Sequence, residues 1–454
     1  MLVTILAFLF ILAFSITIHE FGHFLVAKLF KIPVEKFSIG YGPPLIRMKI
    51  GETDFRIAYF PLGGYVKIAG EEEPALKTLK TNNTENTAPH NNTEDTESKD
   101  PLNTRKGESD KGVKGFYDAP IYKRVMIVLA GPVFNILSAV IVFSIIAGVY
   151  GLLVNPFMKV EVQPDSEAAR AGLLTNDSIV AVSGYKVKDW DELYEILLAR
   201  QGQEVAIGYV RNNAYQEQVI LVDIDSLGIS PVVPPVLGSL KLNGPAQRAG
   251  MKPGVRVLQI EDRAIETWNQ MIEVIRRSRD IPLHFTWDDR GEIKSAQITP
   301  AKYYDPISQD TIGQIGAIMP LERHHLPFVD VVSFSVRRSG EVLVLTVRTL
   351  YQLVVGRISR RALGGPIAIA QLSGESARWG FENLLGLLAI ISINLGLVNL
   401  FPIPALDGGH VIIAVIEAIR RRRFSVRTRM IIQQVGYALI LLLIVYVTFN
   451  DITR

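Results

Sequence analysis

The chain has 454 residues, too many for one small domain, and its 48% apolar residues and mean hydropathy of +0.23 favour a membrane protein over a soluble one. The formal net charge is only +3, and no aromatic–basic cluster or zinc-finger spacing is present, so we expect no nucleic-acid partner. The absence of cysteine excludes disulfides, thiolate metal sites and a cysteine nucleophile.

The first apolar run, residues 1–26, is long enough for a membrane-spanning helix, which needs about 20 residues. The alternative is a cleaved signal peptide. It is disfavoured because no Lys or Arg precedes Lys28 and no small-residue cleavage site follows the run. The run contains His19, Glu20 and His23, and ionisable groups in hydrocarbon are expensive unless they are paired or bind something.

These three residues form the sequence HEFGH, an H-E-x-x-H pattern typical of zinc hydrolases. On a helix, His19 and His23 share a face, so both imidazoles can reach one ion. Glu20 is placed to take a proton from the attacking water. The alternative, two surface histidines on an ordinary helix, is disfavoured by the apolar surroundings. Catalytic zinc usually takes three protein ligands, so a third is expected elsewhere.

The connection over 27–121 contains three predicted parts. Residues 54–70 alternate apolar and polar side chains before Pro61 and Gly63-Gly64, which predicts a hairpin or re-entrant strand beside the first span. The segment FSIGYGPPL (37–45) is interpreted as a neighbouring membrane-associated turn. Residues 71–115 have almost no large apolar side chains and are predicted to be a disordered cytoplasmic insert.

A second span is predicted over 122–150, and an internal repeat follows it. Residues 166–193 align without gaps over 244–271, at an offset of 78, with matching Arg-Ala-Gly triplets and with Trp190 over Trp268. A repeat of this length predicts two copies of one domain, over 156–232 and 233–320.

The repeat resembles tandem PDZ domains in the circularly permuted bacterial arrangement, which implies that each copy takes up an extended peptide at a sheet edge. The alternative is a pair of spacer domains that bind nothing. The second copy has Val255 and Asp262 where the first has Asp177 and Gly184, so the two copies need not share a ligand.

The last part of the chain is predicted to hold two more spans, over 384–406 and 431–449. We interpret 328–383 as an interfacial amphipathic region, although a fifth span there is an alternative. Pro402 and Pro404 must break the third span, and broken helices at membrane depth are tolerated where they line a site. Asp407 follows the break and is the favoured third ligand, with His410 as its competitor.

Loop charge predicts the orientation in the membrane. Basic residues flank both ends of the first connection, and a cluster of arginines fills the connection before the last span, so both connections are predicted to be cytoplasmic. Four spans then place both termini and the repeat domains on the outer side, the periplasm of a Gram-negative cell. These basic residues are Lys28, Lys31, Lys36, Lys123 and Arg124, then Arg420, Arg421, Arg422, Arg423, Arg427 and Arg429.

HExxH in the first span, followed by NLFPIPALDGG (399–409) in a late span, resembles the site-2 protease family of intramembrane zinc metalloproteases. Tandem PDZ domains between the second and third of four spans narrow the resemblance to a bacterial branch of that family. The expected fold is a polytopic α-helical membrane protein with four transmembrane helices, a membrane re-entrant β-hairpin and two extracytoplasmic α+β PDZ domains.

The resemblance implies Zn²⁺ as cofactor, His19, His23 and Asp407 as its ligands, and Glu20 as general base. It implies that Asn399 helps to hold the substrate backbone. The expected substrates are single-span membrane proteins in the bacterial inner membrane, either a pre-trimmed anti-sigma factor or remnant signal peptides. The active site is expected near the cytoplasmic side.

Two further hypotheses concern the substrate. An unwound substrate is expected to add as a strand to the hairpin, at Gly63, Gly64, Tyr65, Val66 and Lys67, and the PDZ pair is expected to exclude substrates with a bulky outer domain. The rival interpretations are a metal transporter, which leaves Glu20 unexplained, and a catalytically dead scaffold that binds peptides.

Overall fold

The computed structural model describes residues 1–70, 115–224, 226–305, 310–357 and 364–453. The chain divides into two compact units, which are described separately. Unit 1 comprises Met1–Ser144, Val332–Ala377 and Leu384–Arg454, and unit 2 comprises Ile145–Val331 and Arg378–Asn383. The predicted insert over 71–115 lies outside the described residues, apart from Gly115.

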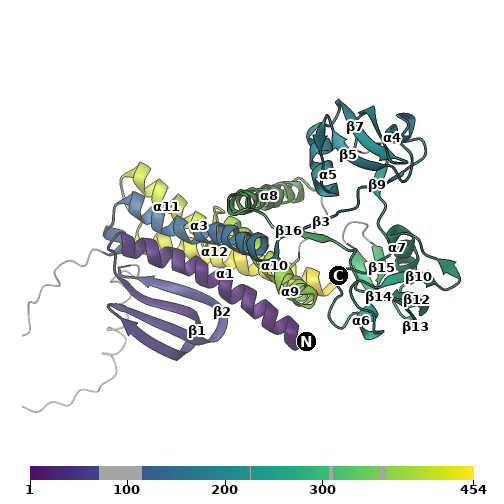
Figure 1. Ribbon diagram of the computed structural model, residues 1–454. Helices are drawn as coiled ribbons and strands as arrows, with labels where there is room; N and C mark the ends of the chain where they lie inside the picture. The colour runs from purple at the N-terminus through teal and green to yellow at the C-terminus, as the bar shows by residue number, and fades with distance from the viewer. Residues whose placement is uncertain (71–114, 225, 306–309, 358–363, 454) are drawn as a thin grey trace, which may run out of the picture. The chain divides into compact units, whose positions relative to one another are not determined.

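As predicted, the described part of the chain has four helices that are long and apolar enough to cross a membrane. Apart from the C-terminal end of the third span, their helical ranges extend up to a few residues beyond the predicted spans, because polar flanking residues continue the helices beyond the apolar runs. The four helices are α1 (Leu2–Leu29), α3 (Ile121–Ile145, continued as a π-helix over Ile146–Tyr150), α10 (Phe381–Asn399) and α12 (Val426–Thr453) (Figure 1).

The third span ends earlier than the predicted residue 406. Helix α10 stops at Asn399, and residues 400–406 form a loop before α11 (Asp407–Arg420). Pro402 and Pro404 lack the backbone N–H that a helix interior needs, which explains the break. The break places Asp407 in the first turn of α11.

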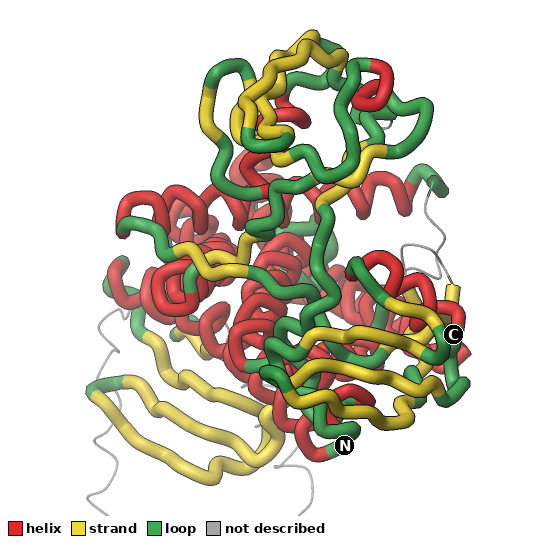
Figure 2. The backbone as a smooth tube through the Cα atoms, turned by 45° about the vertical axis from the view of Figure 1, so that its right-hand side comes forward, coloured by secondary structure: helices red, strands yellow, loops and turns green. Residues whose placement is uncertain are grey.

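The segment 54–70, predicted as a hairpin or re-entrant strand beside the first span, is a strand and not a hairpin. Strand β2 (Thr53–Ile68) does not fold back on itself but pairs along its length with β1 (Val34–Ile50), which includes the predicted turn 37–45. The register assigns Lys36–Ile39 two partners, Asp54–Ile57 on one side and Gly64–Lys67 on the other. The pair of strands therefore builds a small bent sheet beside α1 (Figures 1 and 2).

Within this sheet, Gly64–Ile68 forms an edge. These residues have partners in Val34–Ile39, and no strand pairs with their other side among the described residues. Gly63 has a φ of +136°, and a Cβ on it would lie 2.1 Å from the Tyr41 ring, so glycine is required where β2 bends toward this edge.

Residues 328–379 contain two helices, α8 (Phe328–Val354) and α9 (Pro366–Trp379). Helix α8 is 27 residues long, but it is not among the helices apolar enough to span. Asp451 near the end of α12 holds the start of α9, since its carboxylate accepts hydrogen bonds from Gly365 N at 2.8 Å and Ile367 N at 3.0 Å.

Unit 2 contains the predicted repeat, and its elements recur at the predicted offset of 78 residues. Each copy has a short helix, a strand, a two-residue strand, a ten-residue helix and a two-strand hairpin, and each has its own apolar core. The first copy has α4 (Glu167–Arg170), β5 (Ser178–Val182), β6 (Tyr185–Lys186), α5 (Trp190–Ala199), β7 (Glu204–Arg211) and β8 (Ala214–Leu221). The second has α6 (Pro245–Arg248), β10 (Arg256–Ile260), β11 (Arg263–Ala264), α7 (Trp268–Arg277), β12 (Leu283–Asp289) and β13 (Glu292–Ile298).

The copies differ after these elements. In the first copy, β9 (Ile229–Pro231) pairs with β4 (Val160–Val162). In the second copy, β14 (Ala301–Asp305) and β15 (Asp310–Gln314) form a hairpin. Residues 315–320 follow this hairpin and form no named strand. A further pair, β3 (Leu152–Val154) with β16 (Glu322–His324), brings together the two ends of the repeat region.

The sequence difference between Asp177 and Val255 has a structural reason. Asp177 is buried and pairs with Arg211 at 2.7 Å, whereas Val255 is part of the apolar core of the second copy. Burial alone would raise the pKa of the Asp177 carboxyl, but hydrogen bonds from Arg211 and from Leu174 N–H hold that pKa below its usual range.

Candidate metal centre

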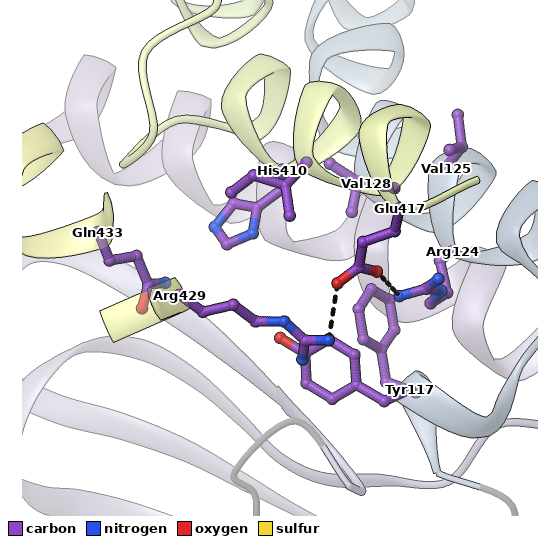
Figure 3. Close-up of a pocket in the computed structure, with 11 residues that line it drawn as sticks. Tyr117, Arg124, Val125, Val128, His410, Glu417, Arg429 and Gln433 are labelled. Carbon is purple, nitrogen blue, oxygen red and sulfur yellow. Dashed lines mark hydrogen bonds and ion pairs between the residues drawn. The ribbon is translucent and has the colours of Figure 1, made fainter. Parts of the chain in front are cut away.

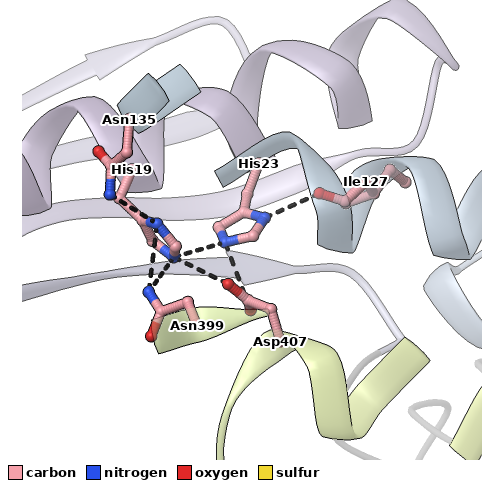
Figure 4. A network of polar contacts seen from close by, with 6 residues as sticks. All are labelled: His19, His23, Ile127, Asn135, Asn399 and Asp407. Atoms are coloured by element: carbon pink, nitrogen blue, oxygen red, sulfur yellow. Dashed lines mark hydrogen bonds and ion pairs between the residues drawn. The ribbon is translucent and has the colours of Figure 1, made fainter. Parts of the chain in front are cut away.

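Three side chains from two helices meet at one point of unit 1. His19 and His23 extend from the same face of α1, and Asp407 faces them from the first turn of α11 (Figure 4). The two Nε2 atoms lie 3.1 Å apart. His19 Nε2 lies 3.0 Å from Asp407 Oδ2, and His23 Nε2 lies 3.7 Å from Asp407 Oδ1.

These atoms fit a tetrahedral zinc ion. Zinc–ligand bonds of 2.0–2.1 Å place neighbouring ligand atoms about 3.3 Å apart, close to the observed separations. Asp407 Oδ2 is buried and has no hydrogen-bond partner among the described residues, because its contact with His19 lacks hydrogen-bond geometry. A buried carboxylate oxygen normally has a partner, and a cation would provide it. Two imidazoles and one carboxylate leave one position open, as catalytic zinc sites do.

Backbone packing brings α3 against this centre. A Cβ on Gly131 would lie 2.4 Å from His23 Nε2 and 2.7 Å from His19 Cε1, and one on Gly22 would lie 2.6 Å from the Ala130 carbonyl oxygen. Glycine at both positions therefore allows α1 and α3 to approach closely with the two imidazoles between them. Nothing in the sequence of one helix alone indicates this requirement.

The imidazoles also have partners on the side away from the centre. His23 Nδ1 lies 2.8 Å from the Ile127 carbonyl oxygen, and His19 Nδ1 lies 3.3 Å from Asn135 Nδ2. Asn399 Nδ2 lies 3.3 Å from His19 Nε2, so this predicted substrate-binding residue borders the centre. Ile127 and Asn135 are not among the residues predicted from the sequence, although a polar amide inside the second span is a visible signal for Asn135.

His410 was the competing ligand, and the structure places it elsewhere. It lines a cavity of about 40 Å³ together with a buried ionic cluster, in which Glu417 accepts hydrogen bonds from Arg124 at 3.1 Å and Arg429 at 2.8 Å (Figure 3). This cluster joins α3, α11 and the start of α12. Among the described residues, the group that could share one ion is His19, His23 and Asp407.

The loop before Asp407 depends on close backbone contacts. A Cβ on Gly408 would lie 2.2 Å from the Leu400 carbonyl oxygen, and one on Gly409 would lie 2.2 Å from the Ile403 carbonyl oxygen. On α12, a Cβ on Gly436 would lie 2.6 Å from Ala405 N. These glycines let the loop fold tightly and hold Asp407 toward α1.

Glu20 lies on α1 next to the edge of the β1–β2 sheet. A Cβ on Gly64 would lie 3.3 Å from Glu20 Cγ, so this side chain and the first residue of the edge are neighbours. Tyr65 stacks on Tyr41 at 6.1 Å between ring centroids, and Lys67 Nζ lies 3.5 Å from Glu35 Oε2. The predicted substrate-binding residues of β2 thus begin beside the candidate base.

The comparisons with known proteins agree with this geometry. The model of Peptidase family M50 matches residues 7–443. The chain is 31% identical over 477 residues to the regulator of sigma-E protease RseP of Salmonella typhimurium and 30% identical over 479 residues to the protein of that name from Escherichia coli, in each case covering 99% of this chain and 98% of the relative. It is also 31% identical over 481 residues to a Vibrio cholerae protein described as a candidate zinc metalloprotease, covering 99% of this chain and 98% of that one.

Among solved structures, the chain is similar to a PDZ domain of an SdrC-like protein from Listeria monocytogenes, with a TM-score of 0.16, 15% identity and coverage of 20% of this chain and 93% of that one. The family match extends from the first candidate span to the last and includes HExxH and Asp407. The chain therefore belongs to peptidase family M50, the site-2 protease family, and is a zinc metalloprotease.

Proposed function

We propose that this protein hydrolyses a peptide bond within the transmembrane segment of single-span membrane proteins. The observation that carries the proposal is the convergence of His19, His23 and Asp407, because two of the three lie on a helix apolar enough to span a membrane. A protease whose metal ligands lie inside the membrane acts on chains that enter the membrane.

The ligands of zinc in this proposal are His19, His23 and Asp407, and Glu20 is the general base. Zinc, when bound, supplies a Lewis acid that polarises the scissile carbonyl and makes water nucleophilic near neutral pH. Glu20 accepts the proton of the attacking water and later delivers it to the leaving amine. Asn399 holds the substrate backbone beside the centre, a role supported by its amide lying 3.3 Å from His19 Nε2.

The substrate binds as an extended strand. A helical backbone is hydrogen-bonded to itself, so the scissile bond must first be unwound. The edge over Gly64–Ile68, which contains four of the five predicted substrate-binding residues of β2, offers backbone groups for strand addition, and its start lies beside Glu20. An added strand would therefore run from the sheet toward the base.

The proposed substrate class is supported by two of the relatives, each of which is named regulator of sigma-E protease. We propose a pre-trimmed anti-sigma factor as a substrate, with remnant signal peptides as a second class. The protein acts in the bacterial inner membrane, in contact with lipid. Both termini and the repeat domains are on the periplasmic side, the active site is near the cytoplasmic side, and the repeat domains act as PDZ-type filters of substrate size.

The test compares the wild-type protein with Glu20→Gln, both purified in detergent. We expect the wild type to cleave a single-span model substrate within its span, and Glu20→Gln to retain zinc but lose cleavage. The loss should reach about 10²-fold or more, the usual contribution of a general base.

The control for the ligand set is Asp407→Asn, which should lose both zinc and cleavage. If Glu20→Gln cleaves as well as the wild type, the mechanism is wrong. Zinc that exchanges rapidly and is carried across a vesicle membrane would favour the rival interpretation of the protein as a metal transporter. Tight zinc without cleavage of any substrate of this class would favour the scaffold.

A further inference from the structure

The two candidate histidine ligands differ in what holds the ring nitrogen that points away from the centre. His23 Nδ1 faces the Ile127 carbonyl oxygen at 2.8 Å. A carbonyl oxygen only accepts, so Nδ1 carries the proton and Nε2 keeps the lone pair that a metal ligand needs. The backbone of α3 therefore sets the tautomer of His23.

His19 lacks a partner of this kind. The polar atoms near its Nδ1 are two amide nitrogens, Asn135 Nδ2 at 3.3 Å and Asn399 Nδ2 at 3.4 Å, but the Asn399 nitrogen also lies 3.3 Å from Nε2. Asn135 is therefore the amide that faces Nδ1 specifically. Amide nitrogens only donate, so Nδ1 accepts in this arrangement and the proton of the neutral imidazole sits on Nε2, which lies 3.1 Å from the unprotonated His23 Nε2. That tautomer cannot bind zinc through Nε2. Zinc binding requires the proton to move to Nδ1, where it needs an acceptor.

Asn135 holds such an acceptor. Its side chain is fully buried, and Oδ1 has no hydrogen-bond partner among the described residues. A half-turn of the terminal amide exchanges Oδ1 and Nδ2 and brings the oxygen to His19 Nδ1. We infer that Asn135 is a positioning residue for zinc, whose Oδ1 accepts the Nδ1 proton of His19 and leaves Nε2 unprotonated toward the metal.

Asn399 does not serve this role equally well. It lies at the end of α10, where the helix breaks, and is partly exposed, whereas Asn135 lies inside α3. A Cβ on Gly396 of α10 would lie 3.2 Å from Asn135 Cβ, so the two helices pack closely at this point and hold the Asn135 side chain beside His19. Asn399 then remains available to the substrate. This inference rests on the proposed ligand set.

The test measures zinc affinity of the full-length protein in detergent by competition with a chelator, without substrate. Asn135→Leu keeps the branching of the side chain at Cγ but removes the acceptor, and we expect zinc to bind about 10- to 100-fold more weakly. Asn135→Asp keeps an acceptor and should bind zinc at least as tightly as the wild type. Ser138→Ala is the matched control: it removes a buried hydroxyl one turn away, which donates to the Asn135 backbone, and should leave zinc affinity unchanged.

Wild-type affinity in Asn135→Leu overturns the inference, as does an equal loss in Asn135→Asp, because either result removes the need for an acceptor. If Asn135→Leu does not fold, Asn135→Asp still tests the inference. Zinc affinity equal to or above that of the wild type supports the need for an acceptor, and a clear loss of affinity overturns it. His19→Ala is measured in parallel: if its zinc affinity is unchanged, the ligand set itself is wrong. Because no cleavage is measured, failure to find a substrate cannot imitate any of these results.

Discussion

At the scale of single residues, Gly131 is as closely tied to the centre as the ligands are. Its missing side chain leaves room for both imidazoles, and the nearest atoms to a built Cβ belong to His23 and His19. In Gly131→Ala we expect the rings to be displaced from the ligand geometry and zinc affinity to fall about 10-fold or more, as it does when groups that orient ligands are lost. Chelator competition measures the change.

The control for this substitution is Gly386→Ala. Gly386 lies inside the apolar helix α10, and a Cβ on it would contact nothing within 4 Å. The added methyl should leave zinc affinity unchanged. Equal zinc affinity in Gly131→Ala and the wild type would show that α3 yields to the methyl group and does not determine the positions of the imidazoles.

The residues of the centre differ in how far the sequence could predict them. The sequence alone predicted His19, Glu20 and His23, because i, i+4 spacing is a local property of a helix. The sequence also predicted Asp407, because an ionisable residue directly after a broken span is unusual. For Asn135, the polar amide inside an apolar span was a visible signal, but its role and that of Gly131 exist only once α3 packs against α1, and no local pattern encodes that crossing.

At the scale of elements, the edge of β2 is the feature that the substrate hypothesis requires. Alternate residues of an edge strand direct their N–H groups toward the partner strand and away from it. Proline at the outward position among Tyr65, Val66 and Lys67 should keep the pairing with β1 but remove one bond to an added strand. We expect cleavage to fall by up to about tenfold, since a backbone hydrogen bond is worth about 1 kcal/mol.

Alanine at the same positions is the matched control, because it removes the side chain and retains the N–H. Resistance of the sheet to limited proteolysis identifies the variants that keep the β1–β2 pairing. Proline and alanine variants that cleave equally well, with the sheet intact, would exclude strand addition at this edge.

The pairing of strands in the β1–β2 sheet could not be predicted from the sequence. The alternation of apolar and polar residues predicted an extended segment over 54–70, but it did not indicate which strand pairs with that segment. The structure pairs this segment with Val34–Ile50, and Lys36–Ile39 forms the middle of the sheet with a neighbour on each side. Such pairing depends on contacts between separated segments. The repeat domains were easier, because a period of 78 residues is visible without any contact information.

At the scale of the whole molecule, the β3–β16 pair offers a clean way to test the filter hypothesis. Leu153 pairs with Arg323 and Val154 with Glu322, so the two ends of the region 156–320 lie next to each other. Each repeat copy has its own apolar core. Replacing 156–320 by a short Gly-Ser turn should therefore preserve the β3–β16 ladder and the fold of unit 1.

We expect this deletion variant to cleave a trimmed single-span substrate at the wild-type rate and also to cleave the untrimmed substrate, which the wild type spares. The physical reason is steric: the deletion removes the folded domains that the filter hypothesis requires to exclude a bulky outer domain, and it leaves His19, His23, Asp407 and Glu20 in place. Cleavage of both substrates by the purified variants measures the effect, and adding Glu20→Gln to the deletion should abolish it. A deletion variant that still requires trimming would place the size filter within unit 1, and the repeat domains would then act as spacers or bind another ligand.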